Sequence, residues 1–385
     1  MASNVQHLML LCRCLKRGMD RAEKSQLRDE LTSADDGLTG LISLASEQYL
    51  TPALYCALIE IDLLVCLPGE LQTYLAGVYK LNLERNEDLK KQALETAATL
   101  NGIDIEPVLL KGGVHLFHPA FDDLGSRMMV DIDMMVPKAK LEHCIEVLKT
   151  DGYVPEGIEW TYHFPAMERP GDRATLELHA EAAEQRSVLP ADEALSDAVP
   201  IDAGSGVRLK SLSPTHQVWH NIFHAQVQDR NYVLGTLPVR QIYDFAALNE
   251  RLNGSIDWQA LSERMRAHGL HKVLAAHLYQ ADKLFGVSID PVVLGSPGPA
   301  LGTRLHFRRC LTQFRWRPLG SIARSLGALT HPFKKYNIEL IYGQSNGLFS
   351  LLIKRLRHAA HLLAKYKFAL FARIASNKDM HYLSL

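Results

Sequence analysis

The stretch from Met128 to Val136 sets two aspartates, Asp131 and Asp133, among apolar residues that favour a β-strand. Side chains alternate between the two faces of a strand, so both carboxylates share one face, about 7 Å apart at Cα. Three apolar side chains are expected to point the other way, into a core: Val130, Ile132 and Met134. Like charges held together on one face repel each other, and a divalent cation removes that cost. Mg²⁺ takes carboxylate and phosphate oxygens as ligands, so this stretch predicts a strand that carries a metal site.

The segment before this strand has features of a phosphate-binding turn. An apolar run at 108–110 predicts another strand, and it ends in Lys111, Gly112 and Gly113. Glycines let the backbone approach a ligand closely, and free amides at a following helix start attract anions. Lys111 adds a point charge suited to phosphate, and Arg127 could add a forked contact.

A third carboxylate is expected from a later strand. Residues 174–179 alternate between polar and apolar, so Thr175, Glu177 and His179 share one face. Glu177 would therefore join the two aspartates. We interpret His179 as a structural neighbour of the site rather than as a ligand or a base.

The order of these motifs resembles that of a known family. Asp-x-Asp alone is weak evidence, but Leu-Lys-Gly, an arginine, Asp-Ile-Asp, Gly152-Tyr153 and Glu-Leu-His form a more specific series. Over roughly residues 40–290 the chain resembles the uncharacterised nucleotidyltransferase family of the polymerase-β-like superfamily. The resemblance implies an α+β fold, in which a small mixed β-sheet nucleotidyltransferase core is embedded in a largely helical chain.

The resemblance also implies roles for individual residues. Asp131, Asp133 and Glu177 would be the catalytic and metal-binding carboxylates, and Gly112 and Gly113 would lie in the turn that faces the triphosphate. One departure concerns this turn, because the superfamily usually has Gly-Ser there and a shorter gap to the acids. The remaining nucleotide contacts expected from the sequence are Lys111 and Arg127.

The leading hypothesis is a Mg²⁺-dependent nucleotidyltransferase that moves an NMP from an NTP to a hydroxyl acceptor, with Mn²⁺ as a substitute metal. One alternative is a non-catalytic nucleotide-binding scaffold, which the turn without serine keeps open. Another is a toxin-type nucleotidyltransferase that acts on tRNA or protein. The plainer interpretations are a solvated strand edge for the acids, an ordinary turn for the glycines, and an ion pair of Arg127 with Asp122 or Asp123.

Hydrophobic periodicity and turn signals divide the chain into four regions. These are an N-terminal helical region at 1–100, the nucleotidyltransferase-like core at 101–210, a helical domain at 211–295, and a basic helical region at 301–385. Within them the pattern predicts helices at 71–100, 141–148, 239–251, 258–269 and 272–285. The second of these is expected to end at Asp151-Gly152, where glycine can adopt the left-handed C-cap conformation. Residues 185–210 are expected to be loop with one short strand at 207–209.

Ser213-Pro214 predicts the start of a further helix. His216, His220 and His224 recur on it every four residues and therefore share one face. Imidazoles suit zinc, but no cysteine or acid stands at an obvious ligand spacing in the sequence. Polar packing against the nucleotidyltransferase core is the favoured interpretation.

Charge is unevenly distributed, although the net charge is −1. Residues 301–385 hold fifteen Lys and Arg but only two acids, which leaves 27 basic and 41 acidic residues in 1–300. Basic and aromatic residues alternate over 304–378, which suits docking on the acidic body, an anionic membrane surface or RNA. Six scattered cysteines and the absence of a signal-like N-terminus favour a cytoplasmic protein, peripheral at the inner membrane face if the basic region binds lipid.

Overall fold

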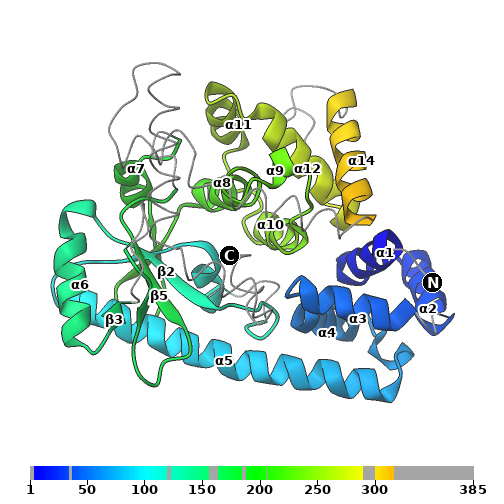
Figure 1. Cartoon of the computed structure of the whole chain (residues 1–385), viewed down its shortest axis with the longest axis horizontal. Coiled ribbons are helices and arrows are strands. Elements are labelled where there is room, and N and C mark those ends of the chain that lie inside the picture. The colour runs from blue at the N-terminus through cyan, green and yellow to red at the C-terminus, as the bar shows by residue number, and fades with distance from the viewer. Residues whose placement is uncertain are drawn as a thin grey trace, which may run out of the picture. The chain divides into compact units, whose positions relative to one another are not determined.

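The computed structural model describes residues 4–33, 37–118, 123–155, 164–183, 188–204, 206–288 and 300–315. The chain divides into two compact units, Met1–Arg315 and Trp316–Leu385, and every described residue belongs to the first. Helices enclose a mixed sheet in this unit (Figure 1), so the predicted α+β class is confirmed. The four-region division within residues 1–385 stays a prediction.

The described helices and strands follow one another along the chain in this order. The N-terminal helices are α1 (Asn4–Leu15), α2 (Arg21–Ser33), α3 (Gly37–Glu47), α4 (Thr51–Glu60) and α5 (Gly69–Asn101). The central elements are β1 (Val108–Leu109), β2 (Asp131–Met135), α6 (Leu141–Thr150), β3 (Val154–Pro155), β4 (Met167–Glu168), β5 (Thr175–His179), α7 (Ala191–Ser196), β6 (Val199–Ile201) and β7 (Leu209–Ser211). The last are α8 (Pro214–Phe223), α9 (Asn231–Leu234), α10 (Val239–Arg251), α11 (Trp258–Ala267), α12 (His271–Phe285) and α14 (Leu301–Arg315).

The sheet has the strand order β3-β4-β5-β2-β1-β7-β6. β2 runs parallel to β5 and antiparallel to β1, and β1 runs parallel to β7. The strands predicted near 108, 131 and 175 are all present, and the last short strand lies at 209–211 rather than at 207–209. The expectation of loop over 185–210 is wrong for α7 and β6, and neither these elements nor the short strands β3 and β4 carried a sequence pattern strong enough to predict them.

Alternation along the strands separates two hydrophobic cores. Ile132 and Met134 pack on one face, with apolar residues of α5 and α6 that recur at helical spacing: Leu89, Ala93, Ala97, Leu100, Cys144 and Leu148. Val108, Leu110 and Met135 belong to the other core, together with α1 to α4 and the helices after β7. The prediction for Val130 is wrong, because this residue precedes the strand and its side chain is 50% exposed.

The 33-residue helix α5 runs beneath both the sheet and α4 (Figure 1). Its predicted extent, 71–100, agrees with the observed one. The helices predicted at 141–148, 239–251, 258–269 and 272–285 are also present. Two local signals have their expected effect, because the Ser213 hydroxyl accepts a hydrogen bond from the His216 amide and Gly152 takes a positive φ after α6.

Only the first part of the basic C-terminal region, residues 300–315, lies within the described chain. There α14 packs on α12 and buries Cys310 and Phe314, while Arg309 donates hydrogen bonds to the carbonyls of Val233 and Leu234. This segment therefore docks on the body of the protein. The membrane and RNA interpretations of 316–378 fall outside the described residues. No described helix combines the length and the apolar character that crossing a bilayer requires.

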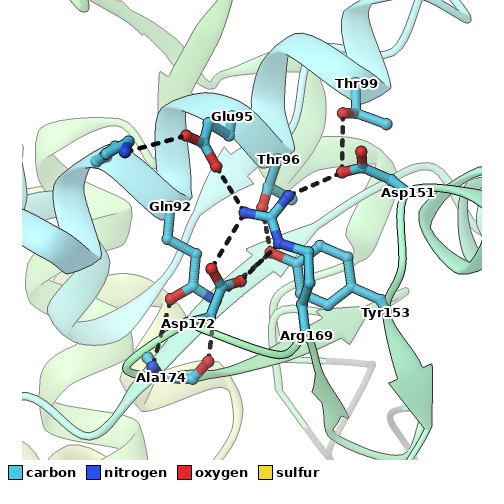
Figure 2. Close-up of polar contacts among 10 residues, drawn as sticks. Gln92, Glu95, Thr96, Thr99, Asp151, Tyr153, Arg169, Asp172 and Ala174 are labelled. Carbon is cyan, nitrogen blue, oxygen red and sulfur yellow. Dashed lines mark hydrogen bonds and ion pairs between the residues drawn. The ribbon is translucent and has the colours of Figure 1, made fainter.

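A charged cluster around Arg169 fastens the sheet to α5 (Figure 2). The Arg169 guanidinium donates to Glu95 on α5, to Asp151 after α6 and to Asp172, at 2.6, 3.1 and 2.9 Å. It also lies over the Tyr153 ring, 4.9 Å from its centroid. Next to it, the Gln92 side chain donates to the Ala174 carbonyl just before β5.

Replacing Arg169 with alanine should lower the free energy of unfolding by roughly 1–3 kcal/mol, because hydrogen bonds to three carboxylates are lost. Urea denaturation measures this. Arg173→Ala is the matched control, because Arg173 pairs with Asp88 at the surface, where both side chains are more than half exposed, and should change stability by less than about 1 kcal/mol. Equal effects of the two changes would contradict an anchoring role for Arg169.

Three buried histidines make stability depend on pH. Burial lowers the pKa of His115, His220 and His277 to about 3, whereas an unfolded histidine titrates near ~6.5. Between these values the unfolded chain binds protons that the folded chain does not bind. The contribution of these histidines to the free energy of unfolding is therefore complete above about pH 6.5, and it is lost as the pH falls toward 3.

The urea midpoint should fall between pH 7.5 and 5, and His277→Asn should reduce the slope of that fall. The asparagine oxygen can take the place of Nδ1, which accepts a hydrogen bond from Gln226 at 3.1 Å, but it does not titrate. His268→Asn is the control, since His268 is exposed. A slope that His277→Asn leaves unchanged would show that this residue does not contribute to the pH dependence.

Candidate active site

The predicted carboxylates come from two neighbouring parallel strands. In the register of β2 and β5, Asp131 pairs with Thr175, Asp133 with Glu177, and Met135 with His179. This places acids and the histidine on the face opposite the α5 core, because Ile132 and Met134 occupy that core. Within the described chain, Asp133, Glu177 and His179 form a group whose ligand atoms all lie within 4.8 Å of one another, so they could hold a metal ion.

Asp133 is the most buried member of the site, at 1% exposure. One of its oxygens, Oδ1, accepts from Lys111 Nζ at 2.6 Å and lies 2.7 Å from His179 Nε2. Burial by itself would raise the pKa of Asp133, but the Lys111 and His179 charges hold it below the usual range. Burial likewise opposes the charge on His179, and its hydrogen bonds to Asp133 and Glu177 raise the His179 pKa above 6.5.

Asp131 has a different environment. Within the described chain its carboxylate forms no hydrogen bond or ion pair, and it is partly exposed. Burial and the neighbouring Asp133 raise its pKa, and Lys111 offsets this only in part. The repulsion expected from the sequence therefore falls on Asp131, because Lys111 and His179 already compensate the charge of Asp133.

The Lys-Gly-Gly turn brings its lysine onto the carboxylates. Residues Lys111–Leu116 form a 3₁₀-helix after β1, and Lys111 itself takes φ +45°. Its Nζ lies 3.9 Å from Glu177 Oε2 as well as next to Asp133. Burial by itself would lower the Lys111 pKa, but the surrounding carboxylates raise it above its usual value. Lys111 thus stays charged at the centre of the site.

Gly112 is buried, and a guanidinium occupies the space beside it. A Cβ atom there would lie 2.3 Å from Arg127 Nη1. Arg127 is held by Asp244 on α10, to which its Nε and Nη2 donate at 3.1 and 2.9 Å. The interpretation that Arg127 pairs with Asp123 is wrong, because Asp123 instead accepts hydrogen bonds from the Tyr79 hydroxyl and from the Gly125 backbone N–H. Asp122 lies outside the described residues.

Polar residues of α5 support the start of β2, and the sequence pattern did not reveal them. Asn82 and Asn86 both donate to the Arg127 carbonyl, and Arg85 donates to the carbonyls of Met129 and Arg173. These bonds hold the backbone just before β2 and β5. In the sequence these residues form only a polar stripe along α5. The structure shows that both asparagines are buried, although Asn is usually exposed.

The three histidines on α8 and the π-helix at His224–Gln228 do not share one site. His220 Nε2 bonds to the Ala182 carbonyl at 2.8 Å, while His224 Nδ1 lies 3.4 Å from Asp229. His216 Nε2 lies 3.4 Å from Glu193 and forms a second possible metal-holding group with Glu193 and Asp197. Arg264 also contacts that Glu193 carboxylate. Polar packing therefore describes His220 well, as the sequence analysis favoured.

Comparison with known families agrees with this arrangement. A family model described as "Uncharacterised nucleotidyltransferase" matches residues 36–286, which is more than half of the chain. The match contains α5, the whole sheet and α8 to α12. No curated protein matches the chain significantly.

The contact between Gly112 and Arg127 can be tested by Gly112→Ala. The new methyl group should displace Arg127 from Asp244 and lower the melting temperature. Gly77→Ala on α5 is the control: nothing lies within 4 Å of its Cβ position, and alanine favours a helix over glycine by roughly 0.5–1 kcal/mol. In an Arg127→Ala background the cost of Gly112→Ala should shrink, because the clash is gone. An undiminished cost in the double variant would contradict this explanation of the glycine.

Proposed function

Because this chain belongs to the family of uncharacterised nucleotidyltransferases, we propose that it transfers an NMP from an NTP to a hydroxyl acceptor with Mg²⁺ as cofactor. A nucleotidyltransferase domain covers most of the chain. The observation that supports the metal and the substrate is the carboxylate group of β2 and β5. Three acids on one sheet face, two of them in direct register, match the oxygen ligands that Mg²⁺ prefers.

The donor set fits a hard divalent cation. Asp131, Asp133 and Glu177 supply carboxylate oxygens, and no cysteine is near them within the described chain. Within the described residues Asp131 has no ion-pair partner, and burial and the Asp133 charge raise its pKa, so a bound cation would stabilise its ionised form. His179 is the one nitrogen ligand that this cluster could offer a metal ion. We assign it a different role, in which its Nε2–H donates a hydrogen bond to Asp133 and orients that carboxylate. Mn²⁺ is proposed to substitute, since it accepts similar ligands.

The residues would divide the work as follows. Bound Mg²⁺ supplies Lewis-acid stabilisation of the phosphate charge that develops during displacement at the α-phosphate. Asp131, Asp133 and Glu177 hold the metal, and the partly exposed Asp131 is the carboxylate open to the acceptor hydroxyl. Lys111 would contact the incoming phosphate while it also pairs with the acids. The Gly112–Gly113 turn would let the backbone approach the same phosphate. Arg127 Nη1 is the guanidinium nitrogen that Asp244 leaves available for phosphate.

Asp131→Asn should reduce the affinity for Mg²⁺ and ATP by at least about tenfold, which corresponds to ~1.4 kcal/mol, without lowering the melting temperature. Asp133→Asn should also weaken binding, but it should lower the melting temperature, because Lys111 and His179 lose their anionic partner. Titration calorimetry and thermal unfolding measure both effects. Asp104→Asn, at a side chain that is 94% exposed, is the control for an acid outside the site. Wild-type affinity in Asp131→Asn would defeat the metal assignment.

A labelling experiment on the full-length protein distinguishes the toxin-type function from the non-catalytic scaffold. Incubation with α-labelled NTPs, Mg²⁺ and a cell extract should place label on an acceptor and release pyrophosphate. Label on tRNA or on protein would favour the toxin-type function. Binding of NTP without any transfer would favour the non-catalytic nucleotide-binding scaffold with a basic membrane- or RNA-binding tail.

A further inference from the structure

Arg240 is a cation that lacks an anionic partner within the described chain. It lies in the first turn of α10, is partly buried, and forms no hydrogen bond or ion pair with any described residue. Its guanidinium lies instead over the ring of Tyr49, 5.4 Å from the centroid. Burial and the nearby Arg127 charge lower the Arg240 pKa. A partly buried arginine without an anionic partner lowers the stability of the fold, and a bound anion would offset this cost.

The surrounding charges indicate where that anion would lie. The charges of two acids, Asp244 and Asp131, act to raise the Arg240 pKa. Asp244 has both oxygens engaged by Arg127. Asp131, four residues after Arg127 in the chain, forms no ion pair within the described residues. Arg127 packs against Gly112 of the Lys-Gly-Gly turn and pairs with Asp244, one turn along α10 from Arg240. This chain of contacts puts Arg240 on the face of α10 that meets the segment before β2.

A ligand that carries a metal cation and phosphate oxygens together would satisfy both charges. The cation would meet Asp131, and the phosphate would meet the guanidinium fork, whose geometry matches phosphate oxygens. A carboxylate ligand alone would leave Asp131 without a cation, and a metal ion alone would leave Arg240 without an anion. The pair of residues thus selects a metal-bound polyphosphate.

We propose that Arg240 binds the terminal phosphates of the metal-bound NTP, and that Tyr49 holds its guanidinium in place. The proposal rests on the nucleotidyltransferase function proposed above and adds a phosphate-binding residue from outside the sheet. Tyr49 lies in the turn between α3 and α4 with φ +56°, and its side chain is 50% exposed. This cation–π contact uses none of the N–H groups of the guanidinium as hydrogen-bond donors to oxygen, so they are left for a ligand.

An ion pair fixes the position of α10, which carries Arg240. Arg127 from the segment before β2 pairs with Asp244, one turn further along α10 from Arg240. This buried ion pair fixes the helix against the catalytic strands. Because residues four apart share a helix face, Asp244 and Arg240 face the site together, so the ion pair sets the position of the free guanidinium.

The test measures binding of Mg²⁺ with ATP, with inorganic triphosphate and with AMP by titration calorimetry. Arg240→Met keeps the length of the side chain and removes its charge. It should weaken ATP and triphosphate binding by about tenfold to a hundredfold, the loss expected from one or two hydrogen bonds to a charged group, and change AMP binding by less than about twofold. Arg240→Lys should recover part of the loss, because lysine keeps the charge but not the fork. Tyr49→Leu should weaken triphosphate binding in the same direction.

Thermal unfolding without ligand separates a ligand-binding arginine from a structural one. Arg240→Met should melt at the wild-type temperature or above, because an unpaired buried charge is removed. Arg127→Met should melt lower, because it leaves Asp244 unpaired. Arg266→Met, at an exposed position on α11, is the control for charge removal alone.

The possible failures are distinguishable. If the wild type binds Mg²⁺ with ATP and Asp131→Asn abolishes this, but Arg240→Met binds as the wild type does, the role of Arg240 is overturned and the proposed function stands. An equal loss of ATP and AMP affinity in Arg240→Met, or a clearly lower melting temperature, would also overturn it. If the wild type binds neither ATP nor triphosphate with Mg²⁺, both proposals fail.

Discussion

The buried charge of Asp133 is the constraint on which the site depends. A carboxylate at 1% exposure in the middle of a strand is stable only if cations or N–H groups surround it. Lys111 and His179 meet this need at 2.6 and 2.7 Å. They come from the turn after β1 and from the end of β5, so the charge ties together three segments that lie far apart in the sequence. Misplacing any of these strands would leave a buried ion without its partners.

The two aspartates of β2 consequently have different roles, although the sequence presents them as a pair. Asp133 is compensated within the protein and resembles a fixed part of the framework. Asp131 is partly exposed, has a raised pKa and lacks a counterion within the described chain. A site that holds one acid firmly and leaves the next unsatisfied is stable without ligand and still has affinity for a cation.

Helices supply the frame that the short strands cannot supply by themselves. α5 contacts the backbone before β2 through Asn82, Arg85 and Asn86, and its Glu95 contacts Arg169 in the connection from β4 to β5. α10 closes the opposite side through the Arg127–Asp244 pair. Gly112 allows this pair to form, because any side chain there would meet the guanidinium. β2 and β5 are thus held by polar contacts from helices that come before and after them in the sequence.

The sequence by itself determined the features that depend on local periodicity. The alternation of 131–135 and 175–179, the long helix α5, the cap at Ser213 and the left-handed Gly152 all follow from residues within a few positions of one another. The order of the motifs also identified the family. Short strands such as β3 and β4, at two residues each, carry too few side chains for a pattern, so pairing with their neighbours decides them.

Only the tertiary structure decided which charges meet. Arg127 finds its partner at Asp244, 117 positions away, and not at the nearby acids that its sequence context suggested. The sequence suggested phosphate as a partner of Lys111, and only the fold revealed its ion pairs with Asp133 and Glu177. Tyr49 and Arg240 had no sequence signal at all. The physical reason is that charge interactions act through space over several ångströms, so chain topology, rather than local sequence, selects the partner of each ionised side chain.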